Sequence, residues 1–279
     1  MKLLVTGAAG MLGRRVVAEA RSRGHEVVEA DLAEFDLTDA AATDAFLIDT
    51  APRVVVNCAA YTQVDRAEED EPLALAVNGT GAGNVARAAL AAGARVVHVS
   101  TDYVFDGTQD RPWVESDATG PLGAYGRTKL AGEHEVLAAG PEHAIVRTAW
   151  LFGAGGPNFP DTMLRLAREH GRLRVVTDQI GSPTWTGHLA RALVACAETP
   201  ERTGIFHAAG AGPGVSWHAF AREIVARAGL DVPVEGVTSD AFPRPAPRPA
   251  WSVLCSEREH PLVLPPWQDG LQAHLDERT

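Results

Sequence analysis

The feature that most constrains the fold is the alternation of short apolar runs with longer Ala-rich segments over the first 150 residues. Buried strands alternating with helices are typical of a parallel sheet that is covered on both faces. The sequence therefore predicts an α/β protein with a Rossmann-type doubly wound parallel sheet. The predicted strands are Lys2–Thr6, Glu26–Ala30, Val54–Asn57, Arg95–Ser100 and Ala144–Arg147, and the predicted helices are Met11–Arg23, Asp39–Asp49, Pro72–Ala92 and Ala124–Ala139.

A glycine-rich segment joins the first predicted strand directly to the first predicted helix. In Gly7-Ala-Ala-Gly10-Met-Leu-Gly13, the first Gly allows a tight turn and the second lets the backbone approach a pyrophosphate. The helix that follows offers free amides and the positive end of its dipole to the phosphates. The segment predicts a dinucleotide cofactor, with contacts from Gly7, Gly10, Met11, Leu12 and Gly13.

The end of the second predicted strand bears on the choice of cofactor. Asp31 lies 24 residues after Gly7, where a carboxylate binds the adenosine ribose hydroxyls and repels a 2′-phosphate. This favours NADH over NADPH, although Arg14 and Arg15 follow the glycine motif and partly offset the negative charge. Further cofactor contacts are expected from Asp36 and Leu37 at the adenine and from Cys58, Ala59 and Ala60 after the third strand.

The composition changes after Trp150, where Gly and Pro become dense and helices are separated by irregular segments. We therefore expect residues 1–150 to form the NAD(P)-binding domain, with the chain returning to it from the second half. Residues 151–279 are expected to form mainly a smaller α/β substrate-binding lobe.

Charge and cysteine usage exclude several classes of protein. A net charge of −11 and a pI near 5.4 argue against nucleic acid and anionic membranes as partners. The three cysteines are far apart and form no CxxC or Cys/His cluster, so neither a disulfide framework nor a metal site is expected. No run approaches the ~18 apolar residues that span a bilayer. We expect a cytoplasmic protein. The sequence leaves open whether the protein forms a homodimer.

Lysine occurs only twice among the 25 basic residues, as Lys2 and Lys129. Lys129 follows Tyr125 by four residues, so a helix places both side chains on one face. An ammonium group beside a phenol favours the phenolate and is expected to lower the pKa of Tyr125. Thr101 ends the fourth predicted strand, where a hydroxyl points into the ligand crevice of an open α/β sheet. Although the spacing alone also fits a chance surface pair, Thr101, Tyr125 and Lys129 together predict a catalytic group.

With these motifs the chain resembles the dTDP-4-dehydrorhamnose reductase family within the extended short-chain dehydrogenase/reductase superfamily. The resemblance covers nearly the whole chain and includes the segments 57–68, 77–80, 100–107 and 147–153. The segments 178–184 and 248–254 are more specific, because generic members of the superfamily lack them.

The resemblance implies that hydride from NADH or NADPH reduces the C4 ketone of a dTDP-linked 4-keto-6-deoxyhexose. Tyr125 would protonate the developing alkoxide, and Thr101 would hydrogen-bond the carbonyl oxygen. Lys129 would hold the nicotinamide ribose and lower the pKa of Tyr125. The remaining residues that the resemblance implicates are Asn78 at the cofactor, Asp102, Tyr103 and Trp150 at the sugar, and Arg248 at the diphosphate.

Other reactions use the same Tyr/Lys pair. Sugar-nucleotide 4,6-dehydratases normally place an Asp-Glu pair after the Thr, whereas this chain has Asp102-Tyr103 and lacks the second carboxylate. A 4-epimerase or a different 4-ketoreductase stays an alternative, because the sequence does not measure cofactor retention. A non-catalytic regulatory subunit that binds a nicotinamide cofactor need not retain Thr101, Tyr125 and Lys129 together, so their presence favours an enzyme.

Overall fold

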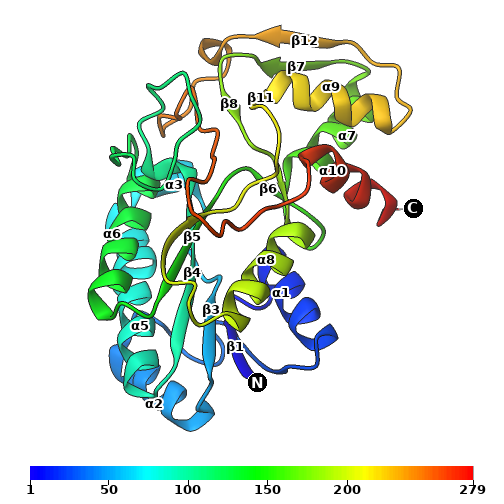
Figure 1. Cartoon of the computed structure of the whole chain (residues 1–279). Coiled ribbons are helices and arrows are strands. Elements are labelled where there is room, and N and C mark those ends of the chain that lie inside the picture. Colours follow the sequence, from blue (N-terminus) through cyan, green and yellow to red (C-terminus); the bar gives the residue numbers. More distant parts are fainter. Residues whose placement is uncertain (279) are drawn as a thin grey trace.

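Six parallel strands form the central sheet, in the order β10-β5-β4-β3-β1-β2 (Figure 1). The computed structural model describes residues 1–278. The strands are β1 (Lys2–Thr6), β2 (Glu26–Ala30), β3 (Val54–Asn57), β4 (Arg95–Thr101), β5 (Ala144–Thr148) and β10 (Gly204–His207). The strand order reverses at β1, since β2 lies on one side of it and β3 on the other, and this reversal opens a ligand crevice at the carboxyl ends. The predicted parallel sheet is confirmed.

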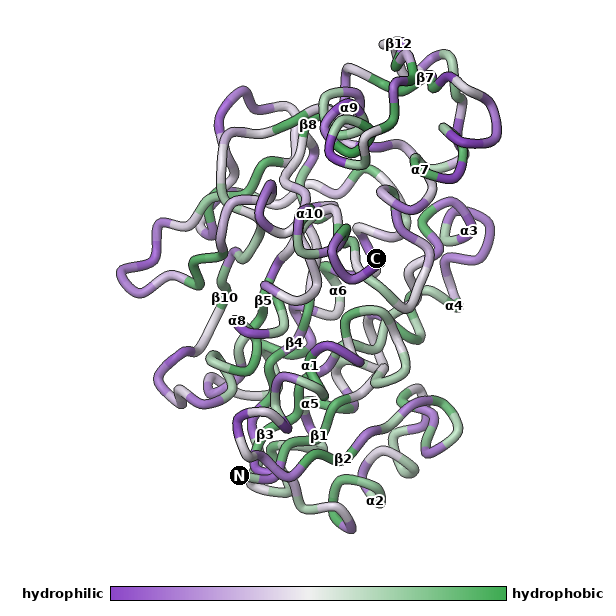
Figure 2. Tube along the Cα trace, turned by 90° about the vertical axis from the view of Figure 1, so that its right-hand side faces the viewer, coloured by the Kyte–Doolittle hydropathy of each residue, from purple (hydrophilic) through white to green (hydrophobic). Residues whose placement is uncertain are grey.

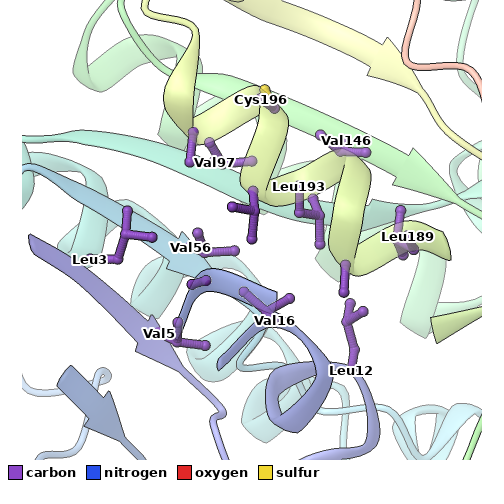
Figure 3. Packing of buried hydrophobic residues seen from close by; sticks show 14 of the residues in the cluster. Leu3, Val5, Leu12, Val16, Val56, Val97, Val146, Leu189, Leu193 and Cys196 are labelled. Carbon is purple, nitrogen blue, oxygen red and sulfur yellow. The ribbon is translucent and has the colours of Figure 1, made fainter. Parts of the chain in front are cut away.

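Helices cover both faces of the sheet, because successive residues of each strand point to opposite faces. On one face Leu3 and Val5 pack under α1 (Met11–Ser22) and α8 (Thr186–Glu198), as Figure 3 shows. On the other face Leu4 belongs to the cluster beneath α2 (Ala40–Thr50), α5 (Ala82–Ala91) and α6 (Ala124–Ala139). Figure 2 shows the apolar residues running along β1, β3 and β4 in the interior.

The predicted helix Pro72–Ala92 is interrupted. It consists of α4 (Glu71–Leu75), a π-helical segment η1 (Ala76–Gly81) and α5. In the π-helical segment, Asn78 accepts from the Tyr61 amide at 2.8 Å and donates to Thr128 at 3.1 Å. A π-helical turn contains one extra residue, which changes the direction of a side chain. The spacing of apolar residues in the sequence does not reveal such an extra residue. The short helix α3 (Val64–Glu69) was also not predicted.

A smaller lobe lies above the sheet and has its own aromatic core (Figure 1). Phe152, Trp185, Phe220 and Trp267 are buried in this core. The lobe contains α7 (Phe159–His170), α9 (Trp217–Arg227), α10 (Trp267–Asp276), β7 (Leu173–Val176) and β12 (Val234–Val237). The remaining short elements are η2 (Asp102–Val104), η3 (Ser239–Ala241), β6 (Leu151–Phe152), β8 (Ile180–Gly181), β9 (Thr184–Trp185) and β11 (Val215–Ser216). Within residues 1–278, no helix has both the length and the apolar content needed to cross a bilayer.

A buried ion pair fastens α6 to the sheet. Arg147 of β5 donates to both carboxylate oxygens of Glu133 on α6, at 2.9 and 2.6 Å, and both side chains are almost fully buried. Ser100 of β4 donates to the same carboxylate at 2.5 Å. Removing one partner of a buried pair leaves an uncompensated charge, which is far more costly than replacing both partners.

We therefore expect Glu133→Gln to lower the free energy of unfolding by about 3–5 kcal/mol. The double variant Glu133→Leu/Arg147→Met, which buries no charge, should lose less than the single variant. Urea unfolding of the two variants and the wild type measures both values. A single variant that loses less than about 1 kcal/mol would contradict this role of the ion pair.

Candidate active site

A cavity of about 900 Å³ opens at the carboxyl end of the sheet, between the sheet and the smaller lobe. Its walls come from the turns after β1, β2, β3 and β4, from α6 and from the start of the lobe. The structure thus brings most of the predicted residues together in one cavity. Those lining it are Gly7, Gly10, Met11, Leu12, Gly13, Asp31, Asp36, Leu37, Cys58, Ala59, Ala60, Thr101, Asp102, Tyr103, Tyr125, Lys129 and Trp150.

The glycine turn has the form that a dinucleotide requires. Gly7 has φ +64°, and a Cβ there would lie 2.8 Å from the amide nitrogen of Ala59 in the turn after β3. A Cβ at Gly13 would overlap the carbonyl oxygen of Gly7. Gly10 is the N-cap of helix α1, no described side chain caps the helix, and its first turn holds no acidic residue. Its amides are therefore available to a pyrophosphate, and the residues fit a nicotinamide dinucleotide.

Asp31 is tied to the glycine turn. Its Oδ2 accepts from the Ala9 amide at 2.8 Å, which holds the carboxylate in the wall of the cavity next to the glycine turn. Arg14 donates from Nε to the Ala9 carbonyl at 2.7 Å and so stays beside the turn. Arg15 instead forms an ion pair with Glu277 near the C-terminus. Of the two arginines expected to offset Asp31, only Arg14 lies at the turn.

Tyr125 differs from the sequence-based expectation. Desolvation and, to a smaller extent, the charge of Asp102 raise the pKa of Tyr125 to about 12, although a hydrogen bond with Thr101 opposes the rise. The expectation that Lys129 lowers this pKa is wrong, because burial and Asp102 raise it, and Lys129 Nζ instead donates to the Val99 carbonyl at 2.8 Å. A phenol with a raised pKa keeps its proton at neutral pH, which is the form that a proton donor needs.

Thr101 and Asp102 form a polar corner beside Tyr125. The Thr101 hydroxyl donates to Asp102 Oδ1 at 2.9 Å and accepts from the Tyr103 amide at 3.2 Å. Asp102 Oδ2 is buried and makes no hydrogen bond of ordinary geometry with the described residues, although Ser252 is near enough to lower the pKa. Burial prevails and raises the pKa of Asp102 to about 6. An unpartnered acceptor in a cavity wall suits a ligand hydroxyl.

Trp150 is stacked face to face on Trp217, which the sequence did not single out. The ring centroids are 3.4 Å apart and the planes differ by 2°. Trp150 has φ +47°, an unusual conformation for a bulky residue, and a Cβ at Gly181 would overlap its indole. Trp217 also lines the cavity. The Trp150–Trp217 pair therefore forms part of the cavity wall, and no local signal at the start of α9 could have shown this.

Two predicted site residues do not line the cavity. The Asn78 side chain is used to hold Tyr61 and Thr128, so it supports the cavity wall from behind. The Arg248 guanidinium is held by both carboxylate oxygens of Asp65 on α3, at 3.0 Å each. Thr148, which the sequence analysis missed, lines the cavity with a buried hydroxyl that has no partner among the described residues.

Comparison with known families identifies the chain. The family model described as RmlD substrate binding domain matches residues 1–279. The chain belongs to the RmlD substrate binding domain family. Membership in the RmlD substrate binding domain family confirms the resemblance found in the sequence, since relatives within it carry the name dTDP-4-dehydrorhamnose reductase.

Relatives of the RmlD substrate binding domain family match over nearly their whole length. A dTDP-4-dehydrorhamnose reductase of Mycobacterium tuberculosis is 45% identical over 98% of this chain and 92% of that protein. A probable dTDP-4,6-dihydroxy-2-methyloxan-3-one 4-ketoreductase of Streptomyces antibioticus is 43% identical over 98% and 93%. The crystal structure of dTDP-4-dehydrorhamnose reductase from Bacillus anthracis in complex with NADP has a TM-score of 0.95 and 35% identity, covering 99% of both chains.

The raised pKa of Asp102 predicts a pH-dependent stability. Between about pH 4 and pH 6 the folded state binds more protons than the unfolded state, so stability falls as the pH rises. Asp102→Asn removes this penalty, and its stability relative to wild type should rise by at most about 3 kcal/mol across that range. Urea unfolding at several pH values measures the difference.

Asp36→Asn is the matched control, because hydrogen bonds from Thr38 lower the pKa of Asp36. Near and below about pH 4, its stability relative to wild type should change in the opposite direction, falling as the pH rises. The same pH trend in both variants would contradict the assigned environment of Asp102.

Proposed function

We propose that this protein reduces the C4 ketone of a dTDP-linked 4-keto-6-deoxyhexose with hydride from NADH or NADPH. The observation that carries the proposal is that Thr101, Tyr125 and Lys129 line one cavity with the glycine turn. The relatives named dTDP-4-dehydrorhamnose reductase support the substrate class, since they match almost the whole chain.

The bound cofactor supplies the hydride, and the protein supplies the proton and the polar surroundings. Tyr125 donates its proton to the oxygen that becomes the alkoxide, and its raised pKa keeps that proton in place beforehand. The Thr101 hydroxyl, which donates to Asp102 in the structure, turns to donate to the same oxygen. Both contacts strengthen as negative charge develops, which is the requirement for catalysis rather than simple binding. Lys129 binds the nicotinamide ribose.

The sugar is bound by the polar corner and the aromatic pair. Asp102 Oδ2 accepts from a sugar hydroxyl, and Tyr103 lies edge-on to Tyr125 with ring centroids 5.5 Å apart. The apolar side of a deoxysugar packs on the Trp150–Trp217 pair. Arg248 does not line the cavity, so it binds the diphosphate where the substrate extends beyond the cavity, and it stays paired with Asp65.

A second candidate is another 4-ketoreductase acting on a different dTDP-sugar, favoured by the relative in Streptomyces antibioticus. The two candidates share every step at the ketone and differ only in the sugar. Assaying several dTDP-4-keto sugars side by side separates them, because the favoured substrate has the highest kcat/KM. An epimerase differs from both in keeping its cofactor through the reaction, so it consumes no reduced cofactor.

The test of the function is consumption of reduced cofactor by the purified protein with a dTDP-4-keto-6-deoxyhexose. Tyr125→Phe removes only the hydroxyl, and we expect kcat to fall about 10²-fold or more while cofactor affinity stays near wild type. Absorbance of the reduced nicotinamide and a binding titration measure the two effects. Absence of turnover by the wild type overturns the function, and a variant that keeps most activity excludes Tyr125 as the donor.

The cofactor preference depends on Asp31, and we propose that its charge favours NADH. Because Asp31 also accepts from the Ala9 amide, Asp31→Asn is the suitable variant, since the amide oxygen can retain that bond. Removing the charge should shift the NADPH/NADH ratio of kcat/KM about tenfold toward NADPH, or about 1.4 kcal/mol. An unchanged ratio contradicts the ribose contact. Asp31→Ala removes both the charge and the bond to Ala9, so its comparison with Asp31→Asn separates the effect of the charge from the effect of the turn.

A further inference from the structure

Behind Lys129 lies a chain of buried hydrogen bonds that the proposed reaction does not use. Asn57 ends β3, His98 lies in β4 and Lys129 lies on α6, and their exposed fractions are 1%, 0% and 2%. Asn57 Nδ2 is 3.1 Å from His98 Nδ1, and His98 Nε2 is 3.3 Å from Lys129 Nζ. Each contact between these three buried groups needs one donor and one acceptor. The direction of donation along the chain of hydrogen bonds therefore decides which atoms carry protons.

The turn after β3 sets that direction. The backbone amide of Ala59 donates to Asn57 Oδ1 at 3.2 Å, and the Thr6 hydroxyl donates to the same oxygen at 2.6 Å. A backbone amide can only donate, so the oxygen of Asn57 must face it. The NH₂ group of Asn57 therefore faces His98 and donates to Nδ1.

The tautomer of His98 follows from this direction. Burial lowers the pKa of His98 well below its ordinary value, so the ring is neutral. A neutral ring that accepts at Nδ1 carries its proton on Nε2. That N–H points at Lys129 Nζ. If Lys129 carried an ammonium group, two hydrogen-bond donors would face each other without an acceptor. The uncharged amine instead offers a lone pair to His98 and still donates to the Val99 carbonyl.

We propose that Asn57 and His98 are positioning residues that favour the uncharged amine of Lys129 and so let it exchange a proton near neutral pH. The catalytic meaning of this inference rests on the proposed function, because a group that gains and releases a proton near the working pH is suited to acid–base chemistry. The hydrogen-bond chain itself is a property of the ligand-free fold.

Other groups around Lys129 act in both directions. Burial lowers the pKa of Lys129 to about 8, while Glu133 and Cys58 raise it. Glu133 lies one turn further along α6, and its charge is already paired with Arg147. The titratable or charged groups that surround the site are Cys58 after β3, His98 in β4, Arg147 in β5, Asp102 and Tyr103 in η2, and Tyr125 and Glu133 on α6.

The rarity of lysine makes a direct test practical. Lys2 and Lys129 are the only lysines in the sequence, so Lys2→Arg leaves a single lysine signal. We expect the NMR signal of ¹³C-labelled Lys129 Cε in the ligand-free protein to titrate with a midpoint of about 8. A midpoint near the ordinary lysine value of about 10.4 would overturn the proposal.

Substitutions of Asn57 in the Lys2→Arg background test the direction of the chain. Asn57→Ala removes the donor to Nδ1, so His98 can take the other tautomer and accept from an ammonium group at Nε2. Asn57→Asp enforces that tautomer, since a carboxylate accepts from Nδ1–H. We expect the Lys129 midpoint to rise in both variants, by about 1 pH unit or more in Asn57→Asp.

The double variant His98→Leu/Asn57→Asp separates the tautomer from the added charge. Without the imidazole, the carboxylate acts on Lys129 only through space. The Lys129 midpoint of the double variant should therefore differ from that of His98→Leu by less than half of the shift that Asn57→Asp causes when His98 is present. An equal shift in both backgrounds, or no shift in Asn57→Ala, would overturn the proposal. These titrations need neither cofactor nor turnover, so a protein that reduces no sugar but shows the shifts would refute the proposed function alone.

Discussion

The cavity depends on how α6 is held against the sheet. Arg147, Glu133 and Ser100 join β5, α6 and β4 below the cavity, and each charged group in this cluster has its partners. Burying an ion pair stabilises little by itself, but its geometry is strict because a displaced charge would be left uncompensated. The same helix carries Lys129 one turn before Glu133 and Tyr125 two turns before it. A sliding helix would separate Glu133 from Arg147 as it displaced these two side chains, so the ion pair opposes a change in the register of the site.

The cofactor side is set by a close approach of backbone rather than by charge. Gly7 lets the turn after β1 come against Ala59 in the turn after β3, at a distance that no Cβ could share. Asp31 then fastens the same turn through the Ala9 amide. One carboxylate thus shapes the turn, and we propose that the same group repels a 2′-phosphate. For this reason, a variant that tests the charge of Asp31 must keep an oxygen that accepts from the Ala9 amide.

The substrate side departs most from what the local sequence indicates. Trp150 was expected from its motif, but its partner Trp217 lies at the start of a helix in a different segment. Arg248 was expected at the diphosphate, yet the ionic partner Asp65 lies on a short helix that the sequence did not predict. Tyr125 was expected to have a lowered pKa because Lys129 is near in sequence, whereas burial governs it in the folded protein. Each departure comes from a contact between distant segments.

The sequence by itself determined the parallel sheet, the glycine turn and the location of the proposed catalytic group, because these depend on local patterns. Alternating apolar runs fix which strands are buried, and the i,i+4 spacing places Tyr125 and Lys129 on one face. Only the tertiary structure decided protonation, aromatic stacking and the direction of hydrogen bonds. These depend on desolvation and on partners 17 to 183 residues away, such as Tyr61 for Asn78 and Asp65 for Arg248. His98 shows the difference, since only the fold places it between Asn57 and Lys129.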